Sequence, residues 1–218
     1  MVETIQRIGR VGSGEVYQAF GSLDGQIERF KDVGISPPYL ASPEQVAEIR
    51  VAGVSQDFSR TSMLPIATKG APTILLKDSF LMNPTWARII VRYHNDREYL
   101  SLPNDFYQSA EATAKSEVGK QPEDRSAIIL PFEGYYKSLN SEMDETRFIL
   151  GAQTDNYFGY FGLRTIPFFN LVVDSKDSIV NYLGFQSPPG GSGLYCVNRD
   201  LYYHSGAFGV LKDEFASV

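Results

Sequence analysis

Cysteine and histidine are scarce in this sequence, with one cysteine and two histidines among 218 residues. An internal disulfide and a cysteine-built zinc site each need at least two thiols, so Cys196 alone can form neither. His94 and His204 lie far apart along the chain and cannot form the paired helical motif of zinc or iron sites. His94 falls in a predicted turn, where we expect it to have a structural role. Asp96 and Glu98 lie near it in the sequence and leave a weak surface cation site open. Apart from that alternative, the sequence predicts no metal site and no cofactor.

Basic residues and long apolar runs are also few. Lys and Arg number 20 against 26 Asp and Glu, a net charge of -6, and the basic residues are scattered singly. Because they form no stripe that would neutralise successive phosphates, we expect no direct nucleic-acid partner. The opening residues contain no uninterrupted apolar stretch, which predicts neither a signal peptide nor a transmembrane segment. The hydrophobic content of 43% is typical of a chain with a packed core.

Catalytic motifs are present only as fragments. Gly9, Gly14 and Val16 stand at the offsets of the phosphate-covering loop of protein kinases. Val11 occupies the position of the second glycine, and no His-Arg-Asp or Asp-Phe-Gly tripeptide follows. We interpret this segment as a glycine-rich entry into a first strand.

Cys196 and His204 are the remaining candidates for a nucleophile and its base. A turn at 198–200 would pair Val197 with Leu201 across a hairpin. His204 would then lie diagonally from Cys196, at roughly 7 to 8 Å. Since that separation is too long for proton transfer, we expect Cys196 to be a buried residue of apolar character.

Short β-type runs bounded by Gly, Pro, Asn or Asp recur along the chain. They cover residues 15–20, 26–31, 63–68, 73–78, 86–93, 98–102, 126–132, 146–151, 165–174 and 178–185, and two shorter runs follow near the C-terminus. Turn residues favour hairpins at 21–25, 69–72, 94–97 and 198–200. The pattern predicts an all-β, mainly β chain that forms an antiparallel β-sandwich with one or two short helices, as a single domain over residues 1–218.

The first predicted helix follows a capping signal. Ser42 is followed by Pro43 and, three positions on, by Gln45, which is the spacing of a capping box. Gly53 supplies a stop signal after the apolar positions. We therefore expect a short helix between these residues.

The second predicted helix begins at Asn104 or Asp105 and stops at Gly119. Glu111 and Lys115 are four residues apart and can form an ion pair on its surface. An apolar stripe at helical spacing is formed by Phe106, Ala110, Ala114 and Val118. We expect this helix to be an excursion between strands.

Aromatic residues are abundant, with 14 Phe and 13 Tyr, and they concentrate at 157–170. Alternation along a strand cannot place all of them on one face. Two interpretations follow: a strand buried on both faces, or a surface that is covered when subunits meet. Gly159 and Gly162 are expected to bend or bulge this strand. The candidate assembly residues are Tyr157, Phe158, Tyr160, Phe161, Phe168 and Phe169.

The chain resembles a viral protein family. The shared features are many short strands, a helical excursion at 104–118, an aromatic strand at 166–173 and loops rich in Pro, Gly, Asn and Ser. The family is that of the single jelly-roll coat proteins of tailless, membrane-containing icosahedral viruses. The resemblance implies an eight-stranded jelly roll acting as a self-assembling coat subunit, with copies of itself and a second coat protein as partners. It also implies a place in the virion after synthesis in the host cytoplasm.

Two other function classes stay open. A carbohydrate-binding or adhesin-type β-sandwich module would use exposed tyrosines and Trp86 to stack on sugar rings. Its discriminating feature would be a set of aromatic side chains on one exposed face. An enzyme on a β scaffold is the third class, and it is disfavoured because neither histidine has an identifiable partner.

Overall fold

The computed structural model describes residues 5–21, 23–36, 39–77, 100–102, 104–131, 134–170, 178–186, 193–196 and 206–212. Predictions that concern Trp86, His94 and His204 fall outside these residues. The same holds for the predicted strand at 86–93 and for the predicted turns at 94–97 and 198–200.

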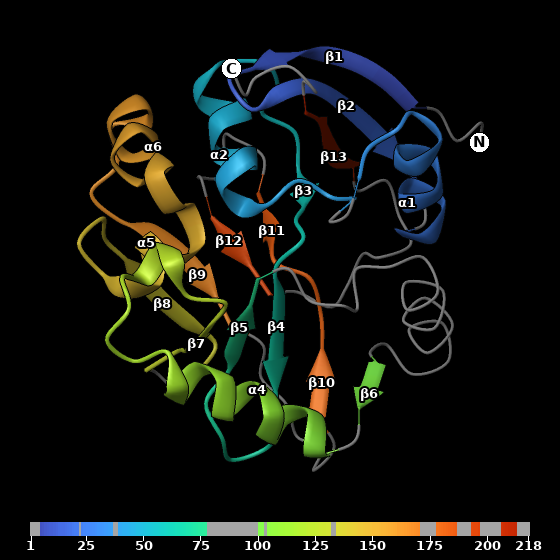
Figure 1. Ribbon diagram of the computed structural model, residues 1–218. Helices are drawn as coiled ribbons and strands as arrows, with labels where there is room; N and C mark the ends of the chain where they lie inside the picture. Colours follow the sequence, from blue (N-terminus) through green and yellow to red (C-terminus); the bar gives the residue numbers. More distant parts are fainter. Residues whose placement is uncertain are drawn as a thin grey trace.

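Two β-sheets organise the described residues (Figure 1). The larger sheet has eight strands in the order β1 (Ile5–Val11), β2 (Gly14–Phe20), β13 (Gly206–Leu211), β3 (Ser59–Arg60), β11 (Gly184–Phe185), β12 (Leu194–Tyr195), β9 (Ile166–Phe169) and β8 (Tyr136–Leu139). The smaller sheet has five strands in the order β6 (Leu100–Leu102), β10 (Ser178–Val180), β4 (Leu64–Ala67), β5 (Ile74–Leu76) and β7 (Ala127–Ile129).

Helices surround these sheets (Figure 1). The described α-helices are α1 (Leu23–Asp32), α2 (Pro43–Val51), α4 (Asn104–Ser116), α5 (Asp144–Leu150) and α6 (Thr154–Phe161), with short 3-10 turns η2 (Pro122–Asp124) and η3 (Gly151–Gln153). Helix α1 packs beside β1 and β2, α4 lies against β5, β7 and β10, and α2, α5 and α6 contact one another. No helix within the described ranges combines the length and the apolar character needed to cross a membrane.

The apolar side chains form two cores on opposite faces of the central strands. Both cores take side chains from the two sheets. One core joins them to α2, α5 and α6, and the other joins them to α1 and α4. Consecutive residues of β13 enter different cores, Phe208 the first and Ala207 the second. Strand side chains alternate between faces, so the middle of the large sheet is buried on both sides.

The glycine-rich opening of the chain forms a β-hairpin. Strand β2 pairs with β1 on one side and with β13 on the other, so the first and last described strands share a neighbour. Gly14 has a φ of 141°, and a Cβ at this position would lie 2.2 Å from the Leu211 carbonyl oxygen. Glycine is therefore required here for packing. The segment does lead into the strand predicted at 15–20, but that strand is the second, because residues 5–11 form β1, which was not predicted.

Local signals correctly predicted both helices. In α2, the Ser42 hydroxyl accepts from the Gln45 amide at 3.2 Å, and the Gln45 side chain accepts from the Ser42 amide at 2.9 Å. In α4, Glu111 and Lys115 form the expected ion pair at 3.0 Å. Val118, placed on the apolar stripe, is instead 78% exposed because the helix ends at Ser116.

The prediction of a mainly β chain with two sheets is confirmed, but two of its strands are helices. Residues 26–31 lie in α1, where Gln26, Ile27 and Phe30 are buried at helical spacing. The predicted turn at 21–25 is wrong for the same reason. Residues 146–150 lie in α5, whose first turn carries acidic residues that favour a helix N-terminus. Five α-helices are described, so the prediction of one or two short helices was too low.

The expectation of a wholly antiparallel jelly roll is also wrong. Strands β12 and β9 pair in parallel, as do β13 and β3. Parallel neighbours need long crossover connections, so turn signals next to a strand do not predict them.

Candidate functional site

Three aromatic side chains lie in one row across neighbouring strands of the large sheet. Tyr136 of β8 stands opposite Phe169 of β9, and Phe169 stands opposite Tyr195 of β12. The alternate residues Phe168 and Leu194 point to the other face and are fully buried. The strand register therefore collects Tyr136, Phe169 and Tyr195 on the face away from that core.

These side chains and Tyr135 form a connected cluster, which we call the aromatic face. The Phe169 and Tyr195 rings stack at 4.3 Å between centroids with an interplanar angle of 13°. Tyr136 and Tyr135 meet the Phe169 ring at 5.4 and 5.5 Å in edge and tilted arrangements. Such pairs stabilise one another beyond the area they bury. Phe169 is thus the centre of a preformed aromatic surface.

The aromatic face combines exposed rings with polar atoms. Tyr135 is 56% exposed and Tyr136 54%, whereas Phe169 and Tyr195 are half-buried. The Tyr195 hydroxyl donates to Oε1 of Gln186 at 2.5 Å. Burial raises the pKa of Tyr195, and the neighbouring Tyr135 raises it further. Its hydroxyl is therefore a neutral hydrogen-bonding group at physiological pH.

Close backbone packing holds the Tyr195 ring in place. A Cβ added to Gly193 would lie 3.0 Å from Cε2 of Tyr195, 3.2 Å from Oε1 of Gln186 and 3.3 Å from Cγ of Pro167. Gly193 therefore leaves the room that the ring and its hydrogen-bond acceptor occupy. In that room the ring is held by its stack on Phe169 and by its hydrogen bond to Gln186, which lowers the entropy cost of using it as a contact surface.

The predicted assembly residues are divided between the interior and the surface. Tyr157, Phe158 and Phe168 lie in the core and cannot reach a neighbouring subunit. Tyr160 is 53% exposed, Phe161 is partly buried, and Phe169 belongs to the aromatic face. A role of these last residues in self-association stays a prediction.

The strand expected at 157–161 is helix α6, and this corrects the predicted bulge as well. Tyr157, Phe158 and Phe161 are spaced so that a helix can direct them to one side. Gly159 lies within the helix, and Gly162 ends it in the left-handed conformation with a φ of 61°. The helical spacing and the terminal glycine were the signals that could have identified a helix here.

Sequence reasoning missed Tyr135, Tyr136 and Tyr195. The alternation of Tyr136 and Ser138 on exposed positions with buried Leu139 was a usable strand signal, but it covers only four residues. The row depends on which strands become neighbours, and turn signals do not supply that information.

Cys196 is buried, 1% exposed, on the core side of the strand that carries Tyr195. Its amide donates to the Phe169 carbonyl at 2.8 Å. The prediction of a buried cysteine of apolar character is confirmed. His204 falls outside the described residues, so its distance to this thiol stays a prediction.

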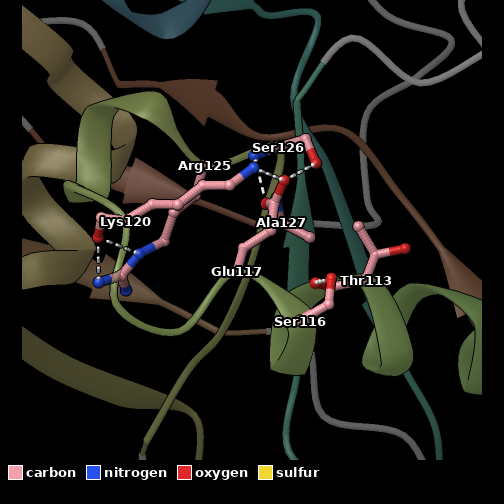
Figure 2. Close-up of polar contacts among 7 residues, drawn as sticks. All are labelled: Thr113, Ser116, Glu117, Lys120, Arg125, Ser126 and Ala127. Atoms are coloured by element: carbon pink, nitrogen blue, oxygen red, sulfur yellow. Dashed lines mark hydrogen bonds and ion pairs between the residues drawn. The ribbon is translucent and has the colours of Figure 1, made fainter.

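Glu117 is the centre of a polar cluster outside the aromatic face (Figure 2). One carboxylate oxygen accepts from Lys120 Nζ at 2.9 Å and from the Ser126 hydroxyl at 3.0 Å. The other accepts from the amides of Ser126 and Ala127 at 2.6 and 3.1 Å. Burial acts to raise its pKa, but these hydrogen bonds outweigh it and lower the pKa to about 2. Glu117 ties the end of α4 to β7, so its role is structural.

A pocket of about 210 Å³ lies where the start of α2 meets η2. Two of its charged groups are held by backbone contacts. Lys77 Nζ donates to the Glu123 carbonyl at 2.8 Å, and Glu44 Oε1 accepts from the Ala152 amide at 2.9 Å. Within the described ranges, no three or more His, Cys, Asp or Glu side chains are grouped to hold a metal ion. The aromatic face is therefore the stronger candidate site.

Comparison with known proteins identifies the fold. No protein-family model and no curated sequence matches the chain. The chain is similar to a solved structure, with a TM-score of 0.63 and 12% sequence identity. That structure is described under the words "Accommodation of massive sequence variation in Nanoarchaeota by the C-type lectin fold". The match covers 93% of this chain and 100% of that chain. This chain has the C-type lectin fold.

The C-type lectin fold overturns the prediction of a viral coat subunit. That prediction depended on a jelly roll, and the match to a different fold extends over nearly the whole chain. The features shared with coat proteins are short strands, aromatic residues and polar loops. These features are common to unrelated β-rich folds.

Proposed function

We propose that this protein is a carbohydrate-binding recognition module of the adhesin type, and that it holds its ligand on the aromatic face. The observation that carries the proposal is the row of Tyr136, Phe169 and Tyr195, flanked by the exposed Tyr135. The C-type lectin fold supports a binding role over an assembly role.

The chemistry of the aromatic face suits a sugar. The apolar C–H face of a pyranose ring packs on an aromatic ring, while its hydroxyls need hydrogen-bond donors and acceptors at the edges of that contact. Tyr136 and Tyr195 supply hydroxyls, and these engage Ser138 at 3.0 Å and Gln186 at 2.5 Å. The rings and these hydrogen-bond partners are uncharged, so we propose a neutral sugar.

The experiment is a binding screen of the full chain against neutral and acidic glycans, followed by titration calorimetry. We expect binding to neutral glycans and a loss of about tenfold or more in affinity for Tyr136→Ala, which corresponds to roughly 1.4 kcal/mol. Tyr160→Ala is the matched control, because Tyr160 is 53% exposed and Tyr136 54%, but Tyr160 lies on α6.

Two results would contradict the proposal. The first is equal loss of affinity in Tyr136→Ala and Tyr160→Ala. The second is an absence of glycan binding together with a protein ligand that requires Tyr136, which would assign the aromatic face to protein recognition.

A further inference from the structure

Arg50 is a fully buried cation in α2, 0% exposed. Its guanidinium donates to the Gln186 carbonyl through Nη1 and to the Asp57 carbonyl through Nη2, each at 2.8 Å. The group also lies over the Phe185 ring, 5.1 Å from its centroid. The guanidinium therefore links a helix, the segment after that helix and the end of β11.

Gln186 connects this buried cation to the aromatic face. Its carbonyl accepts from Arg50, its amide donates to the Gly193 carbonyl at 2.9 Å, and its side chain accepts from the Tyr195 hydroxyl. The backbone of Gln186 is thus held from the core, and its side chain holds Tyr195. The hydrogen bond from Arg50 to Gln186 joins two residues that are 136 positions apart in the sequence.

A buried arginine is an expensive way to fill this volume. Burial lowers the pKa of Arg50, while Tyr157 and the Asp57 carboxylate favour its charged form. An apolar side chain of similar size would avoid the loss of hydration. It could not bind two carbonyl oxygens from separate segments, which the planar, forked guanidinium does. The buried guanidinium is therefore better explained as a group that positions these two segments than as a side chain that fills the core.

We propose that Arg50 is a positioning residue of the ligand site: through Gln186 it sets where the Tyr195 ring lies on the aromatic face. The effect on ligand affinity rests on the proposed function, whereas the effect on the Tyr195 ring does not. Removing the guanidinium releases the Gln186 carbonyl, and the acceptor of the Tyr195 hydroxyl then moves with it.

The test combines tyrosine-selective NMR with glycan titration on Arg50→Lys, with Tyr195→Phe identifying the Tyr195 ring signals. We expect those signals to shift and affinity to fall about tenfold. Arg60→Lys is the matched control, because Arg60 is also buried, 3% exposed, but its Nη1 donates to Gln26 at 3.2 Å instead. It should leave the Tyr195 signals and the affinity unchanged.

Gln186→Ala keeps the carbonyl that Arg50 binds and removes the acceptor of the Tyr195 hydroxyl, so it tests the step from Gln186 to Tyr195 by itself. We expect shifted Tyr195 signals in this variant as well. Unchanged Tyr195 signals in folded Arg50→Lys, or in Gln186→Ala, would overturn the proposal. A wild type that binds no glycan but shows these shifts would overturn the proposed function alone.

Discussion

Replacing Glu117 by glutamine should destabilise the protein in a way that depends on pH. The carboxylate accepts from Lys120, from the Ser126 hydroxyl and from the amides of Ser126 and Ala127. Glutamine keeps one acceptor oxygen and places an NH2 group against donors. At least two of these hydrogen bonds are therefore lost. Hydrogen bonds to charged groups contribute roughly 1.5 to 3 kcal/mol each, and relaxation recovers part of the loss. We expect a cost of about 3 kcal/mol at pH 7.

The pH dependence distinguishes this mechanism from a packing defect. The pKa of Glu117 is lowered to about 2 in the folded protein and returns to about 4.3 on unfolding. Its contribution is therefore complete above the unfolded pKa and is lost as pH falls through the folded pKa. Denaturant unfolding followed by circular dichroism should show the gap between wild type and Glu117→Gln closing from pH 5 to pH 2.

The control for this experiment is Glu123→Gln, since Glu123 is an exposed glutamate a few residues away in η2. It should change the free energy of unfolding by less than about 0.5 kcal/mol. A gap between wild type and Glu117→Gln that stays constant from pH 7 to pH 2 would refute the reasoning.

Four further outcomes are expected. Phe169→Ala should lower the free energy of unfolding by roughly 2 to 3 kcal/mol, because a half-buried ring that contacts three others is removed. In the same denaturant titration, Phe169→Leu should show a smaller loss of this free energy than Phe169→Ala. Gly193→Ala should leave far-ultraviolet circular dichroism unchanged yet weaken glycan binding, since the new methyl group displaces Tyr195; unaltered affinity would contradict this. The raised pKa of Tyr195 means that the neutral hydroxyl favours the folded state, and this contribution is lost as pH rises through the folded value. Burial also raises the pKa of Tyr107 and of Tyr182. Alkaline absorbance titration should therefore show fewer tyrosinates in wild type than in the unfolded chain at the same pH, and Tyr195→Phe should remove one of the late steps. Cys196→Ser should cost about 1 to 2 kcal/mol without loss of binding, because a hydroxyl replaces a thiol in an apolar slot; a folded variant that no longer binds would show a functional thiol.

The elements that sequence reasoning located correctly have local causes. The capping box of Ser42 and Gln45 satisfies backbone groups within one turn, so α2 needs no distant partner. The hairpin of β4 and β5 follows from a turn between two apolar runs. The burial of Cys196 also follows from its residue type alone.

The aromatic face was decided by tertiary structure. Its tyrosines come from 135–136 and 195, and they meet Phe169 because β8, β9 and β12 become neighbours, one pair antiparallel and one parallel. Strand pairing between distant segments is selected by the burial of both cores, and short runs of three or four residues carry little information about their partners. The contact of Arg50 with Gln186 has the same origin. The composition of the chain thus indicated that aromatic side chains matter, and the packing of its sheets determined which of them share a surface.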